Sequence, residues 1–259
     1  MNPSTAEQVQ KLARRSIART FRQPVLIVPN VVFPLFMLAV LSAGGKQITK
    51  VQGFPTHSYV TFILAATLVQ GAASATMFAG NALGGDIETG FLSRLALTPV
   101  RASALVVAQL AGATVLGVMQ AVLYLVVGLI AGVSVKTGVL GVLALLGIVV
   151  LMVLAFGATG LFLAVRTGSA EQVQGLFALA LGLLFLSSMV MPRNLIQADW
   201  FKAIATYNPM SYLVEAGRSL LITGWDAQAL ALGCGIAVAI FVAALAVSIT
   251  SLRGRILNT

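Results

Sequence analysis

Six long stretches of the chain are apolar and free of charged residues, and each is long enough to cross a lipid bilayer as a helix. They are Val25–Ala43, Tyr59–Leu83, Leu105–Ala131, Val139–Val165, Val173–Met191 and Ala227–Ser251. A transmembrane helix needs about 20 residues, because the hydrocarbon core is about 30 Å thick. The sequence therefore predicts an all-α membrane protein with six transmembrane helices.

Composition excludes the main alternatives to a membrane protein. Hydrophobic residues make up 59% of the 259 residues, charged residues only 9%, and the mean hydropathy is +0.99. A soluble domain carries about 25% charged residues, and a disordered chain is far less apolar. The net charge of +9 does not indicate a nucleic-acid partner, because the Lys and Arg residues lie at the ends of the apolar runs. No linker divides the sequence, so residues 1–259 are expected to form a single transmembrane domain.

Residue counts argue against a metal site or a catalytic site. His57 is the only histidine and Cys234 the only cysteine, whereas a zinc site normally needs several such ligands. The sequence has no Gly-x4-Gly-Lys-Ser/Thr phosphate-binding loop. We therefore expect no metal, no catalytic residue and no bound cofactor, and any ATP must be hydrolysed by another polypeptide.

Residues 4–22 predict an amphipathic helix in the membrane interface. Ser4 and Glu7 fit a capping box, which satisfies free amides where a helix starts. On a helical wheel the apolar residues gather on one side, as Ala6, Val9, Leu12, Ala13, Ile17 and Phe21. The basic residues gather on the other side, as Lys11, Arg14, Arg15, Arg19 and Arg22. We expect this basic face to turn toward anionic headgroups; a basic flank without a fixed helix is the alternative.

The distribution of basic residues predicts the orientation. With six spans, ten of the sixteen Lys and Arg residues fall on the side that holds the N-terminus. Because cytoplasmic flanks are enriched in Lys and Arg, we expect a multi-pass protein of the cell membrane with both termini in the cytoplasm.

The connection between the second and third spans, residues 84–101, predicts a short helix with an apolar face. Asp86 or Thr89 can cap it, and Pro99 ends it. The apolar face consists of Phe91, Leu92 and Leu95. The residues alone leave two interpretations open: a helix that docks a soluble cytoplasmic partner, or an interfacial turn that rests on lipid.

The connection before the last span, residues 192–226, predicts a helical hairpin. It is longer than a helix–helix loop needs to be, and it is too apolar to lie in water. Asn208-Pro209 divides it into two short helices. We expect a re-entrant hairpin that dips into the membrane from the outer side, with protein shielding its non-helical backbone; a hairpin lying on the surface is the alternative.

Polar residues form stripes within two spans. In the second span Thr67, Gln70, Ser74, Met77 and Asn81 recur at spacings of three and four. In the third span Gln109 and Gln120 are about three helical turns apart and therefore share a face. Polar side chains in hydrocarbon turn toward partner helices or water. The stripes therefore predict either contacts that hold helices together or the lining of a translocation path. No span centre carries a charge, which disfavours a proton- or sodium-driven carrier.

Three sequence blocks carry a family resemblance. Arg22-Gln23-Pro24 opens the first span, which contains Pro34. Glu88-Thr89-Gly90 leads into Thr98-Pro99-Val100 after the second span. Asn208-Pro209-Met210-Ser211-Tyr212, followed by Arg218, precedes the last span. Through these blocks the chain resembles the type-2 ABC transporter permeases, especially the daunorubicin-resistance group of bacterial drug exporters. The resemblance extends over almost the whole length of the chain.

The resemblance implies a partnership and assigns roles to residues. It implies a second permease subunit, identical or different, and two copies of a cytosolic ATPase that bind ATP and magnesium. The residues that it implies for coupling to the ATPase are Asp86, Glu88, Thr89, Gly90, Phe91, Leu92, Leu95, Thr98 and Pro99. The outer-gate residues that it implies are Asn208, Pro209, Tyr212 and Arg218. Gln70, Ser74, Met77, Asn81, Gln109 and Gln120 are the candidates for the translocation path.

The expected function is export of an amphipathic drug or lipid-like molecule, as in multidrug efflux and antibiotic resistance. Two alternatives remain open from the sequence. A polysaccharide or glycolipid exporter would show more aromatic faces than the 7% aromatic content provides. A non-transporting membrane scaffold would lack an ATPase partner.

Overall fold

The computed structural model describes residues 5–90 and 102–257, and the described part of the chain is helical without strands. The long helices are α2 (Pro24–Gly44), α3 (Tyr59–Ala73) with α4 (Ala75–Glu88), α6 (Ala102–Ile130), α7 (Gly138–Thr167) and α11 (Ala227–Leu257). The shorter helices are α1 (Thr5–Phe21), α8 (Ala170–Phe185), α9 (Asp199–Tyr207) and α10 (Pro209–Arg218). The all-α prediction is therefore confirmed.

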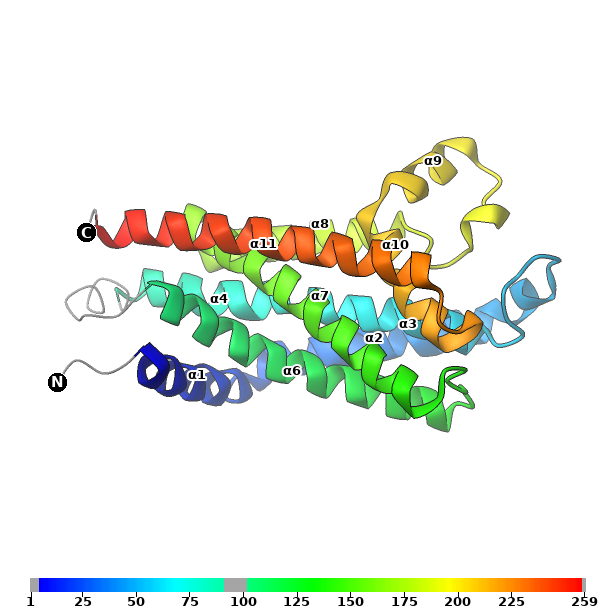
Figure 1. Cartoon of the computed structure of the whole chain (residues 1–259), viewed down its shortest axis with the longest axis horizontal. Coiled ribbons are helices and arrows are strands. Elements are labelled where there is room, and N and C mark those ends of the chain that lie inside the picture. The colour runs from blue at the N-terminus through cyan, green and yellow to red at the C-terminus, as the bar shows by residue number, and fades with distance from the viewer. Residues whose placement is uncertain (1–4, 91–101, 258–259) are drawn as a thin grey trace.

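The long helices run side by side in one bundle (Figure 1). The helix α1, the last turn of α4 and the final turns of α11 lie at one end, which we name the α1 end. The turn between α6 and α7 lies at the other end, with α10 toward that side (Figure 1). This arrangement agrees with an even number of crossings between α1 and the end of α11.

Five of the six predicted spans are helices that are long and apolar enough to cross a membrane: α2, α3 with α4, α6, α7 and α11. The prediction for the remaining span, Val173–Met191, is wrong in its extent. The helix α8 ends at Phe185 after 16 residues, which is about 24 Å of helix. Residues 186–191 are turns, and their backbone groups bond to the hairpin that follows.

The helices α3 and α4 form the centre of the bundle. They are joined at Ser74, and nearly every residue of α3 is buried. Small residues allow this close packing. A Cβ at Gly160 of α7 would overlap the carbonyl oxygen of Thr76, and a Cβ at Gly84 would touch the backbone of Ala170 in α8. Glycine at these positions lets α7 and α8 approach the α4 backbone.

The helix α2 continues through Pro29 and Pro34. Proline lacks an amide hydrogen, which leaves the carbonyl four residues earlier without its helical partner. For Pro34 this carbonyl belongs to Asn30. It accepts hydrogen bonds from Gln120 Nε2 at 3.4 Å and from Tyr124 Oη at 3.2 Å. The neighbouring α6 thus supplies the partners that the proline removes.

Residues 192–226 contain the predicted pair of short helices, with Asn208 as the N-cap of α10. The two helices differ in their surroundings. The helix α10 is largely buried and packs against α3 and α11. The helix α9 projects from the bundle (Figure 1), and Trp200 and Tyr207 on it are 66% and 86% exposed.

Candidate functional site

A buried carboxylate in the last turn of α4 ties three helices together at the α1 end. The side chain of Asp86 is 3% exposed. Its Oδ1 accepts from Arg19 Nη1 at 2.7 Å and from Arg15 Nη2 at 3.2 Å, and its Oδ2 accepts from Gln109 Nε2 at 3.0 Å. Ser16 of α1 donates to Gln109 Oε1 at 3.1 Å. One charge on α4 therefore holds α1 against α6.

These contacts correct the expected placement of the α1 basic face. Arg15 and Arg19 reach Asp86, and Ser16 and Thr20 are buried. Only part of the basic face is therefore free for headgroups. The Asp86 side chain is also not accessible to a soluble partner, because α1 and α6 enclose it.

The next carboxylate of α4 reaches the start of α8. Glu88 Oε1 accepts from the amide of Ala170, the first residue of α8, at 2.9 Å. A carboxylate at a helix N-terminus is favourable, because the free amides there carry partial positive charge. Asp86 and Glu88 thus connect the start of the segment 84–101 to α1 and to α8.

The rest of the expected coupling segment is only partly described. Thr89 donates to the carbonyl of Gly85 at 2.7 Å, and Gly90 has a φ of 67°. The other expected coupling residues, Phe91, Leu92, Leu95, Thr98 and Pro99, lie outside the described residues.

The polar stripe of α3 and α4 is mostly buried, and one of its members, Ser74, bonds to α6. Ser74 Oγ lies 3.1 Å from Gln120 Oε1, and Thr67 donates to the carbonyl of Ile63 at 3.2 Å. Together with the Gln109–Asp86 contact, these bonds make Ser74, Gln109 and Gln120 contacts between helices. Asn81 is half-buried, and its Oδ1 has no hydrogen-bond partner among the described residues.

The other stripe members, Gln70 and Met77, line a cavity of about 370 Å³ between α2, α3–α4 and α8. The helix α2 contributes Pro29, Asn30, Phe33 and Pro34, and α8 contributes Gln174 and Phe177. The described residues that line the cavity are all uncharged. Ligand cavities are typically of this size and mainly apolar, with a few polar groups. The structure therefore separates the predicted stripe into helix contacts and a cavity wall.

At the opposite end, one face of α10 closes the end of α8. The N-cap Asn208 donates from Nδ2 to the carbonyl of Leu183 at 2.6 Å. Ser211 Oγ accepts from the amide of Ser188 at 3.1 Å. The side chain of Ser188 in turn donates to Glu215 Oε1 at 3.0 Å. These hairpin residues form hydrogen bonds with backbone groups at the end of α8 and in the turn after it. Another turn of helix would otherwise have supplied those hydrogen bonds.

Arg218 completes this closure. Its guanidinium donates to the carbonyls of Ser188 and Met189 at 3.1 Å and to the carbonyl of Phe62 at 3.3 Å, and it lies 3.5 Å from the centre of the Phe62 ring. Burial lowers the pKa of Arg218 to about 9, while the Glu215 carboxylate opposes this shift. The guanidinium therefore stays charged at neutral pH and holds the α8 end to α10 and α3.

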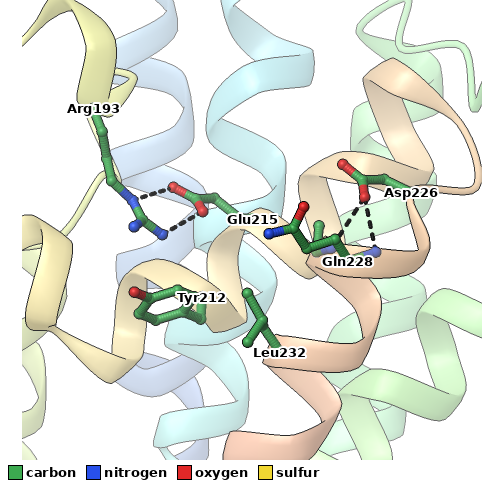
Figure 2. Close-up of a pocket in the computed structure, with 7 residues that line it drawn as sticks. Arg193, Tyr212, Glu215, Asp226, Gln228 and Leu232 are labelled. Carbon is green, nitrogen blue, oxygen red and sulfur yellow. Dashed lines mark hydrogen bonds and ion pairs between the residues drawn. The ribbon is translucent and has the colours of Figure 1, made fainter.

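The surface of this junction is a polar pocket of about 340 Å³ (Figure 2). Arg193 pairs with Glu215 there, and its guanidinium lies 4.4 Å from the centre of the Tyr212 ring. Burial alone would lower the pKa of Arg193, but the bonds to Glu215 outweigh it and raise that pKa above its ordinary value. Tyr212 Oη also donates to the carbonyl of Thr206 at 2.8 Å, which fixes the bend between α9 and α10. Asp226 also lines this pocket, and its Oδ1 caps α11 by accepting from the amides of Gln228 and Ala229 (Figure 2).

Several residues of these sites were not singled out by sequence reasoning. They are Arg15 and Arg19 as partners of Asp86, Asn30, Gln174 and Phe177 in the cavity, and Arg193, Ser211 and Glu215 at the α10 junction. One signal was available: positions 208, 211, 215 and 218 are polar and recur at spacings of three and four, which indicates one polar helix face.

The family model for ABC-2 type transporters matches residues 7–222, which include most of α1, the cavity between α2, α3–α4 and α8, and all of α10. No curated protein matches the sequence. The apolar helices and this match identify a multi-pass membrane protein. The chain belongs to the ABC-2 type transporter family.

Proposed function

We propose that this chain is the membrane-spanning permease subunit of an ATP-driven exporter, and that it moves an amphipathic drug or lipid-like molecule out of the cell. Family membership supports a transmembrane component of an ABC transporter, and we propose that it associates with an ABC ATPase. The bacterial cell membrane, cytoplasmic termini and a place in the daunorubicin-resistance group are further parts of this proposal.

The observation that carries the proposal is a chain of contacts from the segment 84–101 to the uncharged cavity. Glu88 bonds to the first residue of α8, and α8 supplies Gln174 and Phe177 to the cavity wall. A displacement of the segment 84–101 by an ATPase would therefore pull on a helix that shapes the cavity. An uncharged, mainly apolar cavity suits an amphipathic substrate better than an ion or a free sugar.

We propose two copies of the ATPase and a second permease copy or homologue as partners. The cavity lies against α2. Only 11% of the residues in the most apolar stretch of this helix are buried within this chain. A second permease that covers this face would enclose the cavity and leave lipid around the remaining helices. ATP and magnesium belong to the ATPase in this scheme.

The test is a Leu92→Asp plus Leu95→Asp variant, purified with its ATPase from the native membrane. Burying each leucine against a partner stabilises the contact by about 1.5–3 kcal/mol. Losing both should weaken docking by on the order of 10²- to 10⁴-fold, while the spans still insert. Leu92→Met plus Leu95→Met keeps the apolar face and is the matched control.

The expected result is a variant that reaches the membrane, loses the ATPase during purification and does not export. Retention of the ATPase at wild-type levels would show that this segment is not the docking site. A wild-type complex that hydrolyses ATP without moving any amphipathic probe would instead favour the polysaccharide or glycolipid alternative, and a wild-type chain that never retains an ATPase would favour the scaffold.

A further inference from the structure

The cavity between α2, α3–α4 and α8 contains one polar group that the protein leaves unsatisfied. Gln70 is 3% exposed, and its Nε2 has no hydrogen-bond partner among the described residues. Leaving a buried donor unpaired costs about 1–3 kcal/mol. Two other buried atoms, Ser42 Oγ and Asn81 Oδ1, share this condition, but only Gln70 lines this cavity.

The neighbours of Gln70 show that the bundle can satisfy polar groups at this depth. Ser74, one turn further along, contacts Gln120, and Gln120 also donates to Asn30. Thr67 bonds to the preceding turn of its own helix. The unpaired Nε2 is therefore a local exception, and it occurs where an open volume of about 370 Å³ adjoins the side chain.

The chemistry of the cavity indicates what can fill it. An amide N–H is a neutral donor, so its partner must be an acceptor such as a ketone, ester, amide or ether oxygen. A cationic group would find no carboxylate among the described lining residues, and burying an unpaired charge is costly. Phe33, Met77 and Phe177 offer apolar and polarisable surface around the donor.

We propose that Gln70 recognises the substrate: the cavity takes uncharged amphipathic molecules that carry an acceptor oxygen, and the Gln70 amide turns its enclosed Nε2 toward the cavity and donates to that oxygen. This inference rests on the proposed function and narrows its substrate class. Gln70 acts as a specificity-determining residue. The same donor would disfavour pure hydrocarbons, because they leave it unpaired.

The test uses 6-propionyl-2-dimethylaminonaphthalene, a neutral fluorophore whose emission moves to longer wavelength when its ketone accepts a hydrogen bond. Its partner probe is the same naphthalene with a propyl group in place of the propionyl group. Both are titrated into the full chain in lipid nanodiscs, and binding to empty nanodiscs is subtracted. After this correction, wild type should bind the ketone about two- to tenfold more tightly than the propyl probe, as one neutral hydrogen bond provides.

The variant Gln70→Met keeps the length and volume of the side chain without the donor. It should bind the ketone about two- to tenfold less tightly than wild type, shift the emission of the bound ketone to shorter wavelength and leave propyl binding unchanged. Gln172→Met, an exposed position of α8 that does not line the cavity, is the matched control and should match wild type.

Three results would overturn the inference: wild type that binds neither probe, equal binding of both probes by wild type, or equal weakening of both by Gln70→Met. The wild-type comparison needs no variant, so poor folding of Gln70→Met leaves the inference testable. If these results refute the proposed role of Gln70, the proposed permease function still stands, because that function is judged by ATPase retention and export. Conversely, a chain that shows the ketone preference but never retains an ATPase would refute the function alone.

Discussion

Replacing Asp86 by asparagine should release α1 from the bundle while leaving the fold of the spans in place. The substitution removes the charge that Arg15 and Arg19 contact, but the new side chain can still accept from Gln109. The carboxylate is 3% exposed, whereas the two arginine side chains are 42% and 30% exposed. Exposed ion pairs contribute about 0–1 kcal/mol and buried charged hydrogen bonds about 1.5–3 kcal/mol. For two partly exposed contacts we expect a loss of about 2–3 kcal/mol.

Trypsin measures this loss directly, because α1 contains several cleavage sites that Asp86→Asn does not alter. A docked helix resists cleavage, and the cleavage rate follows the population of the open form when opening is fast. A loss of about 2–3 kcal/mol predicts cleavage of α1 in nanodiscs that is roughly 30- to 150-fold faster. Asp199→Asn, an exposed position of α9, is the matched control and should not change the rate. An Asp86→Asn rate within about threefold of wild type would refute the account of Asp86 as the anchor of α1.

Three further predictions follow from other parts of the bundle. Gly160→Ala places a Cβ on a backbone carbonyl of α4 and should lower the free energy of unfolding by about 1–3 kcal/mol, whereas Gly147→Ala, with open space around it, should not. Arg218→Met frees carbonyls after α8 and should speed hydrogen exchange across residues 186–191 by roughly 10- to 150-fold. A cysteine in place of Lys202, in a cysteine-free background, should react with an impermeant thiol reagent from outside the cell.

For each of these three predictions, one experimental result would contradict it. Equal thermal stability of the two glycine variants would mean that α4 and α7 pack less closely than the structure shows. Unchanged exchange in the Arg218 variant would mean that the turns after α8 do not depend on its guanidinium. Labelling of position 202 only from the cytoplasmic side would reverse the orientation and with it the outer-gate hypothesis for the hairpin.

Most of the helices could be predicted from the sequence, because long uncharged apolar runs have few alternatives to a membrane span. The end of α8 could not be predicted in this way. Residues 186–191 are as apolar as a span, and their departure from helix depends on Asn208, Ser211 and Arg218, which lie later in the chain and meet them only in the folded state. Hydropathy carries no information about such distant partners.

Spacing in the sequence indicates which polar residues share a helix face, and it does not indicate which contacts they make. Spacing placed Gln70 and Gln120 on stripes, but only the packing of α2 shows that Gln120 compensates for Pro34 while Gln70 remains unpaired. Asp86 was expected at the docking segment, and its burial by α1 depends on two arginines more than sixty residues earlier. When a helix far away in the sequence buries a charge, the sequence contains no periodic pattern that would indicate it.

The shortness of α8 has a consequence for the surrounding lipid. A helix of about 24 Å beside a span of 30 residues creates hydrophobic mismatch with a bilayer about 30 Å thick. Leu179 and Phe185 on α8 are exposed, so acyl chains next to them would have to compress. Mismatch costs fractions of a kcal/mol per Å, and a few ångströms of thinning would bring headgroups close to the rim of the cavity that α8 helps to form. Bilayers of shorter acyl chains should therefore lower the cost of mismatch around α8. Membrane thickness should then affect how readily molecules pass between the leaflet and the protein.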